Sequence, residues 1–342
     1  MLNKSFLKSL LIRFSGYETY KWLTRKNGLY CFNYHRIGDS TLTLFDPNIY
    51  SCTAEDFKMQ LRFIKKHFQI ITLDEAILLT KNQQPLNKRY ALITFDDAYI
   101  DNYEIAYPIL KEQKISAVFF IPTDYVDSAI IPWWDEIAWM LKNTTKKEFD
   151  FANYGTFHLS QSILNNVIRE FLTLIKSDVR SMDDKMIELK AKLACEYKAS
   201  PKDQSLFVSW EQIKEMQAGG MAMGSHTCSH RILTHISQKE QQIELEKSKH
   251  ILEQHIGCSI DSIAYPVGQS NTFNDDVCNM AERLGYKIGF SFTNIVNDLP
   301  IVDPYKISRL GIDNHPSLMA LRQKIILTIS KKSKYQQGLY NG

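Results

Sequence analysis

The sequence predicts an α/β fold, a distorted (β/α)7-type barrel that carries a helical insertion. Short apolar segments alternate with amphipathic segments of helical period along most of the chain. About seven such units follow one another, and they imply a parallel sheet because right-handed crossovers leave few other topologies. Seven units favour a closed or distorted barrel over an open, doubly wound sheet, and 342 residues is an ordinary length for one barrel.

The first half of the chain alternates between expected strands and helices. Thr53 and Asp56 stand three residues apart, as in a capping box, before an apolar stripe of helical period. A second helix is expected at 101–113 despite Pro108. The strands expected in this half lie at 28–34, 70–73, 90–95 and 117–121.

Residues 141–205 interrupt the alternation. They are polar, rich in lysine and helical in pattern, and we expect them to form an insertion over one face of the barrel. Beyond them, Ser209 and Ser237 each begin a helix, with Gln212 and Glu240 three residues later. The other elements expected in this half are strands at 221–226, 262–265 and 287–292 and a helix at 275–284.

The two ends of the chain differ in charge from its middle. The first 26 residues and the last 21 each sum to +5, so the net charge of +3 leaves −7 for the middle. We therefore divide the chain into a basic amphipathic N-terminal segment (1–27), the barrel domain (28–320) and a basic C-terminal tail (321–342). The small net charge gives no case for nucleic-acid binding, whereas basic ends fit peripheral contact with an anionic membrane surface. Solvated termini are an equally good interpretation.

The cysteines and the N-terminus bear on the compartment. Six cysteines are scattered without CxxC pairs, which is typical of reduced thiols. No apolar run approaches the roughly 20 residues of a membrane span, and Lys8 and Arg13 interrupt the apolar core that a signal peptide needs. We expect a cytoplasmic protein, in contact with a membrane surface if the basic ends bind one, with export as the alternative. The sequence does not indicate an oligomeric state.

Two carboxylates directly follow an expected strand. Asp96 and Asp97 come after the apolar segment 90–95, and the carboxyl ends of barrel strands form the active site. Carboxylates at the tip of a buried strand are costly unless a metal or another cation compensates them. Two aspartates that cap a helix in a βα loop are the alternative.

His226 and His230 lie at the end of another expected strand, in the segment GSHTCSH. A spacing of four residues lets two imidazoles converge on one cation if the segment turns helically. His235 is a competing ligand, although it belongs with the start of the next helix. Two histidines and one aspartate, with a position left for water, are the donor set of a catalytic metal site.

Hydrolysis at such a site needs a base for the water and an acid for the leaving group. Asp96, next to the candidate ligand Asp97, is placed to act as the base. His35 in NYHRI also ends a strand and is a candidate acid, with a packed core histidine as the alternative.

These motifs resemble those of a known family. TFDDAY (94–99) and SHTCSH (225–230) are similar to the first two motifs of the polysaccharide deacetylases, the NodB-homology carbohydrate esterases of family 4. The resemblance runs from about residue 28 to 320. Within the family, the sequence is similar in particular to the deacetylases of the poly-N-acetylglucosamine biofilm type. That narrower resemblance rests on YHRI (34–37), FDDAYIDNY (95–103), WWDEI (133–137), AYPVG (264–268) and SRLGI (308–312).

The resemblance implies a role for each matching residue. Asp97, His226 and His230 would hold the metal, Asp96 would be the base, and His35 would be the acid, as in the biofilm branch. His315 in DNHP is the second candidate for the acid.

Four positions near these motifs match the family pattern, depart from it or extend it. Val267 aligns where the family supplies a backbone N–H to the oxyanion, and Ala264 stands where the family has the arginine that orients the base. We expect Arg309 in SRLGI to approach Asp96 from another side and replace that arginine. Ala98 replaces the usual glycine, which would cause strain if its φ is positive.

The implied activity is metal-dependent hydrolysis of the N-acetyl group of a GlcNAc-type sugar, in a surface polysaccharide or its precursor, with release of acetate. This is a hydrolase reaction on a C–N bond other than a peptide bond. Zn²⁺ is the expected metal, with Co²⁺, Ni²⁺ or Fe²⁺ as alternatives. Trp133, Trp134 and Tyr265 are candidates for a sugar-stacking surface, and Asp135 is expected to cap a helix. The alternatives are an amide hydrolase that acts on a non-sugar substrate and an inactive sugar-binding relative.

Overall fold

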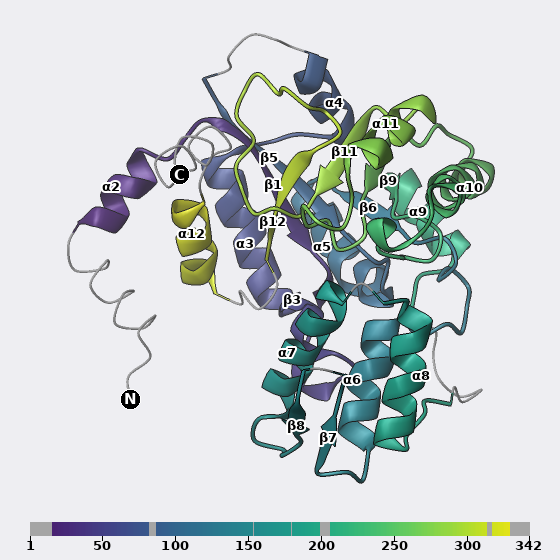
Figure 1. The fold of residues 1–342 in the computed structure, drawn as a ribbon. Helices are drawn as coiled ribbons and strands as arrows, with labels where there is room; N and C mark the ends of the chain where they lie inside the picture. Colours follow the sequence, from purple (N-terminus) through teal and green to yellow (C-terminus); the bar gives the residue numbers. More distant parts are fainter. Residues whose placement is uncertain are drawn as a thin grey trace, which may run out of the picture.

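The computed structural model describes residues 16–81, 87–152, 154–178, 180–198, 206–312 and 317–328. Figure 1 shows a barrel surrounded by helices and a second lobe attached to it. Among the described residues, no helix is both long enough and apolar enough to span a membrane. Most of the N-terminal segment and most of the basic C-terminal tail lie outside the described residues, as does His315.

Seven parallel strands close into a barrel, as the sequence predicts. Each strand pairs with the next around the ring, and β1 closes the ring by pairing with both β12 and β5. The short β4 (Gln69–Ile70) pairs with the start of β5 outside this ring. In order around the barrel the strands are β1 (Gly28–Tyr34), β12 (Ile307–Gly311), β11 (Ile288–Ser291), β10 (Ser262–Ala264), β9 (Ala222–Ser225), β6 (Val118–Ile121) and β5 (Arg89–Phe95).

Helices surround the barrel (Figure 1). Their apolar residues are buried against it. Thr53 caps the first long helix by accepting from the Asp56 N–H, and full capping boxes begin the helices after Ser209 and Ser237. These caps confirm three of the expected helix starts. The helices around the barrel are α2 (Tyr17–Leu23), α3 (Ala54–His67), α4 (Leu73–Lys81), α5 (Tyr107–Gln113), α9 (Trp210–Ala218), α10 (Gln238–Ile256), α11 (Asp275–Arg283) and α12 (Leu318–Leu327).

Several expected elements differ in detail. The strand expected at 70–73 is shorter, because Leu73 already begins α4. The helix expected at 101–113 begins with a π-helical turn, η3 (Asn102–Ala106), before α5. The remaining short elements are β2 (Arg36–Ile37), β3 (Tyr50–Cys52) and the 3₁₀ turns η1 (Ser40–Leu42), η2 (Pro47–Ile49) and η4 (Leu233–His235).

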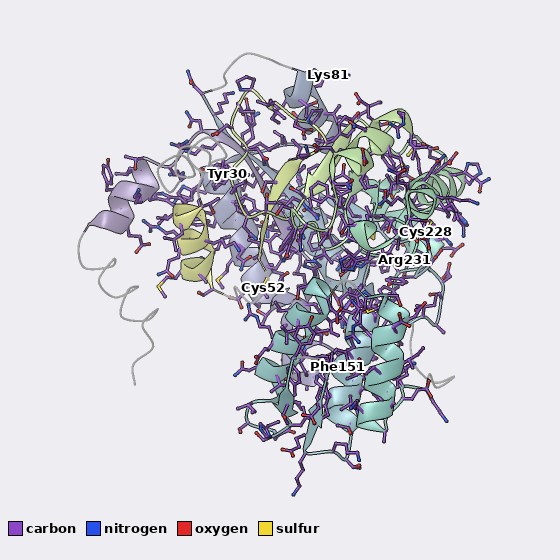
Figure 2. All side chains as sticks on the ribbon, in the orientation of Figure 1. Tyr30, Cys52, Lys81, Phe151, Cys228 and Arg231 are labelled. Atoms are coloured by element: carbon purple, nitrogen blue, oxygen red, sulfur yellow. The ribbon has the colours of Figure 1, made fainter. Side chains whose placement is uncertain are left out.

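The second lobe has its own apolar core. It consists of α6 (Trp133–Asn143), α7 (Leu164–Ser177), α8 (Met182–Leu193) and the hairpin β7 (Glu148–Asp150) and β8 (Thr156–His158). The hairpin was not expected from the sequence. Figure 2 places Phe151 inside this lobe, far from Tyr30 in the barrel core, and the two residues belong to separate apolar clusters.

Candidate active site

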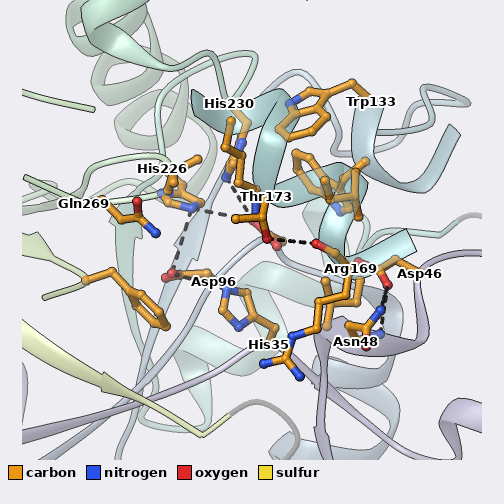
Figure 3. A pocket seen from close by; sticks show the side chains of 17 residues that line it. His35, Asp46, Asn48, Asp96, Trp133, Arg169, Thr173, His226, His230 and Gln269 are labelled. Carbon is orange, nitrogen blue, oxygen red and sulfur yellow. Dashed lines mark hydrogen bonds and ion pairs between the residues drawn. The ribbon is translucent and has the colours of Figure 1, made fainter. Parts of the chain in front are cut away.

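A cavity of about 240 Å³ lies where the barrel meets the second lobe (Figure 3). Its barrel wall is formed by residues that follow strands: His35 after β1, Asp96 after β5, His226 after β9 and Phe292 after β11. Because the barrel strands are parallel, their carboxyl ends meet at one face, and the side chains beyond them converge there.

Asp97, His226 and His230 come together in this cavity. Each offers one donor atom, and these atoms lie within 4.8 Å of one another. The Asp97 Oδ1 atom is 3.5 Å from His226 Nε2 and 3.3 Å from His230 Nε2. All three residues are buried. His235, the competing ligand, lies in η4 and is not part of this cluster.

The donor set fits a divalent cation. Tetrahedral ligands about 2.0–2.2 Å from an ion lie roughly 3.3–3.6 Å apart, which matches the two distances to Asp97 Oδ1. This oxygen is buried and has no hydrogen-bond partner among the described residues, so it needs another source of compensation. Burial lowers the pKa of His230 to about 3, which keeps its imidazole neutral and able to donate a lone pair. His226 Nδ1 lies 2.8 Å from the Ala264 carbonyl oxygen, so its Nε2 can face the ion.

The backbone around these candidate ligands is held in unusual conformations. Asp97, Ala98, Thr227 and His230 all have positive φ angles, between 56° and 71°. Ala98, at 57°, therefore carries the strain that the usual glycine would avoid.

Glu244 of α10 supports the histidine loop and was missed by sequence reasoning. Its Oε2 atom accepts from the backbone N–H groups of Cys228 (2.8 Å) and Ser229 (2.9 Å), and its Oε1 atom accepts from the Ser229 hydroxyl. The buried carboxylate thus fixes the segment between His226 and His230. Its place on the inner face of a long polar helix gave no signal in the sequence.

Asp96 is held by Arg309 and Asn33. The Arg309 Nη1 atom donates to Asp96 Oδ1 at 2.6 Å, and Asn33 Nδ2 donates to Asp96 Oδ2 at 3.0 Å. The expected contact between Arg309 and Asp96 is therefore present. Burial alone would raise the pKa of Asp96, but the Arg309 guanidinium holds it well below its usual range. The carboxylate stays ionised across the physiological pH range.

His35 lies on the other side of Asp96. Its Nε2 atom is 3.8 Å from Asp96 Oδ2. The backbone of His35 is fixed at both ends: its N–H donates to the Ser51 hydroxyl, and its carbonyl accepts from Asn102 Nδ2 at 2.7 Å. Asn102 begins the π-helical turn η3, an element often found at functional sites. The side chain of His35 thus projects into the cavity from a fixed position (Figure 3).

Val267, which follows β10, also lines the cavity. Its φ is 61°, and the next residue, Gly268, also has a positive φ. The Val267 backbone N–H has no acceptor among the residues that the structure describes, so it can donate to a ligand. A Cβ atom on Gly268 would lie 2.8 Å from the Phe292 nitrogen, so this close turn requires glycine.

Two of the three expected aromatic contacts line the cavity. Trp133 is half-buried, and the buried Trp134 packs against His230 with ring centroids 4.6 Å apart. The expectation for Tyr265 is wrong. Its ring is fully buried against Phe273, its hydroxyl donates to a backbone carbonyl, and it does not line the cavity.

Asp135 does not cap its helix either. Pro132 occupies the N-cap of α6, and Asp135 lies fully buried in the first turn. It accepts from the Asp46 N–H at 3.0 Å and from the Tyr99 hydroxyl at 2.7 Å, and Tyr99 in turn accepts from Trp134 Nε1. Burial raises the pKa of Asp135 to about 7.

The second lobe and the segment after β2 supply cavity residues that the sequence did not reveal. Helix α7 contributes Arg169, Thr173 and Lys176, and Asp46 and Asn48 come from the segment around η2. The polar residues of α7 are spaced by four and three positions, which places them on one helical face. This spacing was the sequence signal that could have identified them.

Comparison with known proteins agrees with this geometry. The family model described as polysaccharide deacetylase matches residues 83–289. YxkH of Bacillus subtilis is 24% identical over 237 residues, which are 69% of this chain and 56% of that protein. The poly-β-1,6-N-acetyl-D-glucosamine N-deacetylase of Staphylococcus aureus (strain MSSA476) is 34% identical over 112 residues, 30% of this chain and 38% of that protein. The chain thus spans about half the length, or less, of these curated relatives.

Solved structures share the fold at low identity. The Streptococcus pyogenes deacetylase PplD, solved in complex with acetate, has a TM-score of 0.56 and 19% identity, covering 88% of this chain and 99% of that one. IcaB from Ammonifex degensii has a TM-score of 0.54 and 18% identity, covering 88% and 98%.

Proposed function

Because this chain belongs to the polysaccharide deacetylase family, we propose that it removes the N-acetyl group from a GlcNAc-type sugar in a surface polysaccharide or its precursor. One observation carries the proposal: the convergence of Asp97, His226 and His230 beside the paired carboxylate Asp96. The name of the S. aureus relative, which specifies poly-β-1,6-N-acetylglucosamine, supports this sugar class.

Asp97, His226 and His230 would hold the metal. Two imidazoles and one carboxylate are a donor set that suits Zn²⁺, with Co²⁺, Ni²⁺ and Fe²⁺ as alternatives. When bound, such a cation polarises a carbonyl and lowers the pKa of water toward roughly 7.

Asp96 acts as the base in this proposal. Its carboxylate is ionised and is oriented by Arg309 and Asn33, so it can accept a proton from the water that attacks the acetyl carbon. The Val267 N–H would donate to the carbonyl oxygen as negative charge develops there. His35 would deliver a proton to the departing nitrogen. The products are acetate and the free amine of the sugar.

Trp133 gives the sugar a surface to stack on. It is half-buried at the cavity wall, so one part of its ring packs against Trp134 while the rest can meet a ligand. Trp134 contributes indirectly, because it packs against the candidate ligand His230.

A substrate panel tests the proposal. Purified protein supplied with Zn²⁺ would be incubated with β-1,6- and β-1,4-linked N-acetylglucosamine oligomers and with acetanilide, a non-sugar amide. We expect acetate and free amine in equal amounts from a sugar, and none from the Asp97→Asn variant. Hydrolysis of acetanilide alone would support the non-sugar alternative. Sugar binding without acetate release would support the inactive sugar-binding alternative.

A further inference from the structure

Helix α7 presents a polar face to the active-site cavity that no step of deacetylation uses. Arg169, Thr173 and Lys176 lie four and three residues apart and line the cavity from the second lobe. Figure 3 shows Arg169 and Thr173 at the cavity. The Thr173 hydroxyl donates to the Arg169 carbonyl at 2.8 Å, so its proton is already used within the helix. The two cationic side chains remain as groups that a ligand could meet.

Each carboxylate that lines the cavity faces polar groups other than Arg169. Asp96 is paired with Arg309 at 2.6 Å, and Asp97 faces the two candidate metal-ligating histidines. Burial raises the pKa of Asp46, while hydrogen bonds from Asn48 and the charge of Lys176 act in the opposite direction. Lys176 therefore lies within electrostatic range of one lining carboxylate.

Arg169 has no such partner. It is exposed at the mouth of the cavity, and no carboxylate of the described residues lies within ion-pair distance of it. The neighbouring Glu170 is exposed and does not line this cavity. A guanidinium offers two parallel N–H donors that match a carboxylate or a phosphate. The wall of the cavity thus carries an uncompensated group suited to an anion.

We propose that Arg169, assisted by Lys176, forms a subsite for an anionic group carried by the glycan next to the sugar that loses its acetyl group. The identity of the ligand as an N-acetylated glycan rests on the proposed function. The shared chemistry is a carboxylate, as in a uronic acid, or a phosphate, as in a glycosyl phosphate. The same cavity holds the metal-ligand cluster and Arg169, so one oligosaccharide can meet both.

Paired ligands that differ in charge test the subsite. We would measure by calorimetry the binding of GlcNAc-glucuronic acid and of its neutral counterpart GlcNAc-glucose to the zinc-loaded protein. A second pair, GlcNAc-1-phosphate and methyl N-acetylglucosaminide, separates phosphate from carboxylate. We expect one anionic ligand to bind at least about tenfold more tightly than its neutral counterpart, as for a charge-assisted hydrogen bond. The ratio of the two affinities, anionic ligand to neutral ligand, should fall as salt is added, because Arg169 is exposed.

Variants identify the group responsible. Arg169→Gln should bring the ratio close to one, and Lys176→Gln should reduce it in part. Arg62→Gln, which removes an exposed arginine of α3 that does not line the cavity, should leave the ratio as in the wild type.

Three results would overturn the subsite. The first is equal binding of charged and neutral ligands, or no binding of either. The second is an Arg169→Gln variant that keeps the wild-type ratio. The third is a ratio lost only in Asp97→Asn, which would place the anion on the metal. Acetate release is measured separately, so an anion preference without acetate release would contradict the proposed function and leave the subsite standing.

Discussion

At the scale of single residues, Asp96 and Asp97 show how neighbouring carboxylates acquire different tasks. Arg309 and Asn33 hold both oxygens of Asp96, whereas Asp97 Oδ1 has no hydrogen-bond partner among the described residues. The Asp96 carboxylate is therefore oriented and ionised, as the proposed base must be. Asp97 is left with an oxygen that a cation can bind.

Replacing Arg309 should separate orientation from metal binding. Arg309→Met leaves the buried Asp96 unpaired, so we expect kcat/KM to fall at least about a hundredfold and stability to fall by about 3–5 kcal/mol. Arg309→Lys should restore part of the activity, because it returns the charge without the fixed fork. Steady-state acetate release and thermal unfolding would be compared with zinc content, which should stay near that of the wild type. Full activity in Arg309→Met would contradict the positioning role.

Asp135 should make stability depend on pH. Its pKa is raised to about 7 in the fold by burial, against an ordinary value of 3.8, so folding retains a proton that the unfolded chain releases. The contribution of protonated Asp135 to the free energy of unfolding is complete below pH 4. It is lost as the pH rises through 7, and the loss is on the order of 4 kcal/mol at most.

Asp135→Asn removes the titrating group and can still contact Asp46 and Tyr99. Urea unfolding at pH 5 and pH 8 should show a smaller loss of stability in this variant than in the wild type. Identical losses in both proteins would refute the assignment.

Predictions for single residues were correct where several sequence signals agreed. They were wrong where they rested on one signal. Asp97, His226 and His230 follow strands and occupy known motifs, and they meet in space. Tyr265 was expected in the cavity because it lies close to a strand end, but its ring turns inward to pack on Phe273. Sequence alone does not reveal to which side of the backbone such a loop residue points.

At the scale of elements, the loop after β9 depends on α10 for its shape. Glu244 accepts two backbone N–H groups and a hydroxyl from the segment that links His226 to His230. Without it these donors would be buried and unsatisfied, and the loop would lose its preference for the conformation that brings the histidines together.

Glu244→Ala should therefore weaken zinc binding by about 10–100-fold, the cost typical of losing a group that supports metal ligands. Glu244→Gln keeps a carbonyl oxygen for the backbone donors and should recover much of the affinity. Competition with a chromogenic chelator gives both values. An exposed neighbour, Glu246→Gln, is the matched control. Unchanged zinc affinity in Glu244→Ala would show that the loop holds its shape without this carboxylate.

Helix starts were the most predictable feature of the elements, because capping side chains act locally. Thr53, Ser209 and Ser237 each cap as expected. The hairpin β7–β8 and strand β12 were not foreseen. The hairpin strands are three residues long, so the alternation of apolar and polar residues in them is a weak signal. The burial of β12 depends on neighbours far away in the sequence.

At the scale of the whole molecule, closure of the barrel assembles the site. β1 pairs with both β5 and β12, and this brings Asn33, Asp96 and Arg309 into contact. Along the chain, Arg309 is separated from Asp96 by 213 residues and from Asn33 by 276. The alternation of strands and helices predicted the barrel itself. The interruption at 141–205 predicted an insertion over one face of the barrel, but not that α7 would lie over the cavity, because that depends on packing between the lobes.

We propose that deacetylation depends on a metal held by Asp97, His226 and His230. The most direct measurement is acetate release from an N-acetylglucosamine oligomer by chelator-treated protein as Zn²⁺ is added back, for the wild type and for folded Asp97→Asn. We predict no release without metal, full recovery near one Zn²⁺ per wild-type chain, and neither tight zinc binding nor recovery in the variant. Undiminished acetate release by the metal-free wild-type protein would contradict the account.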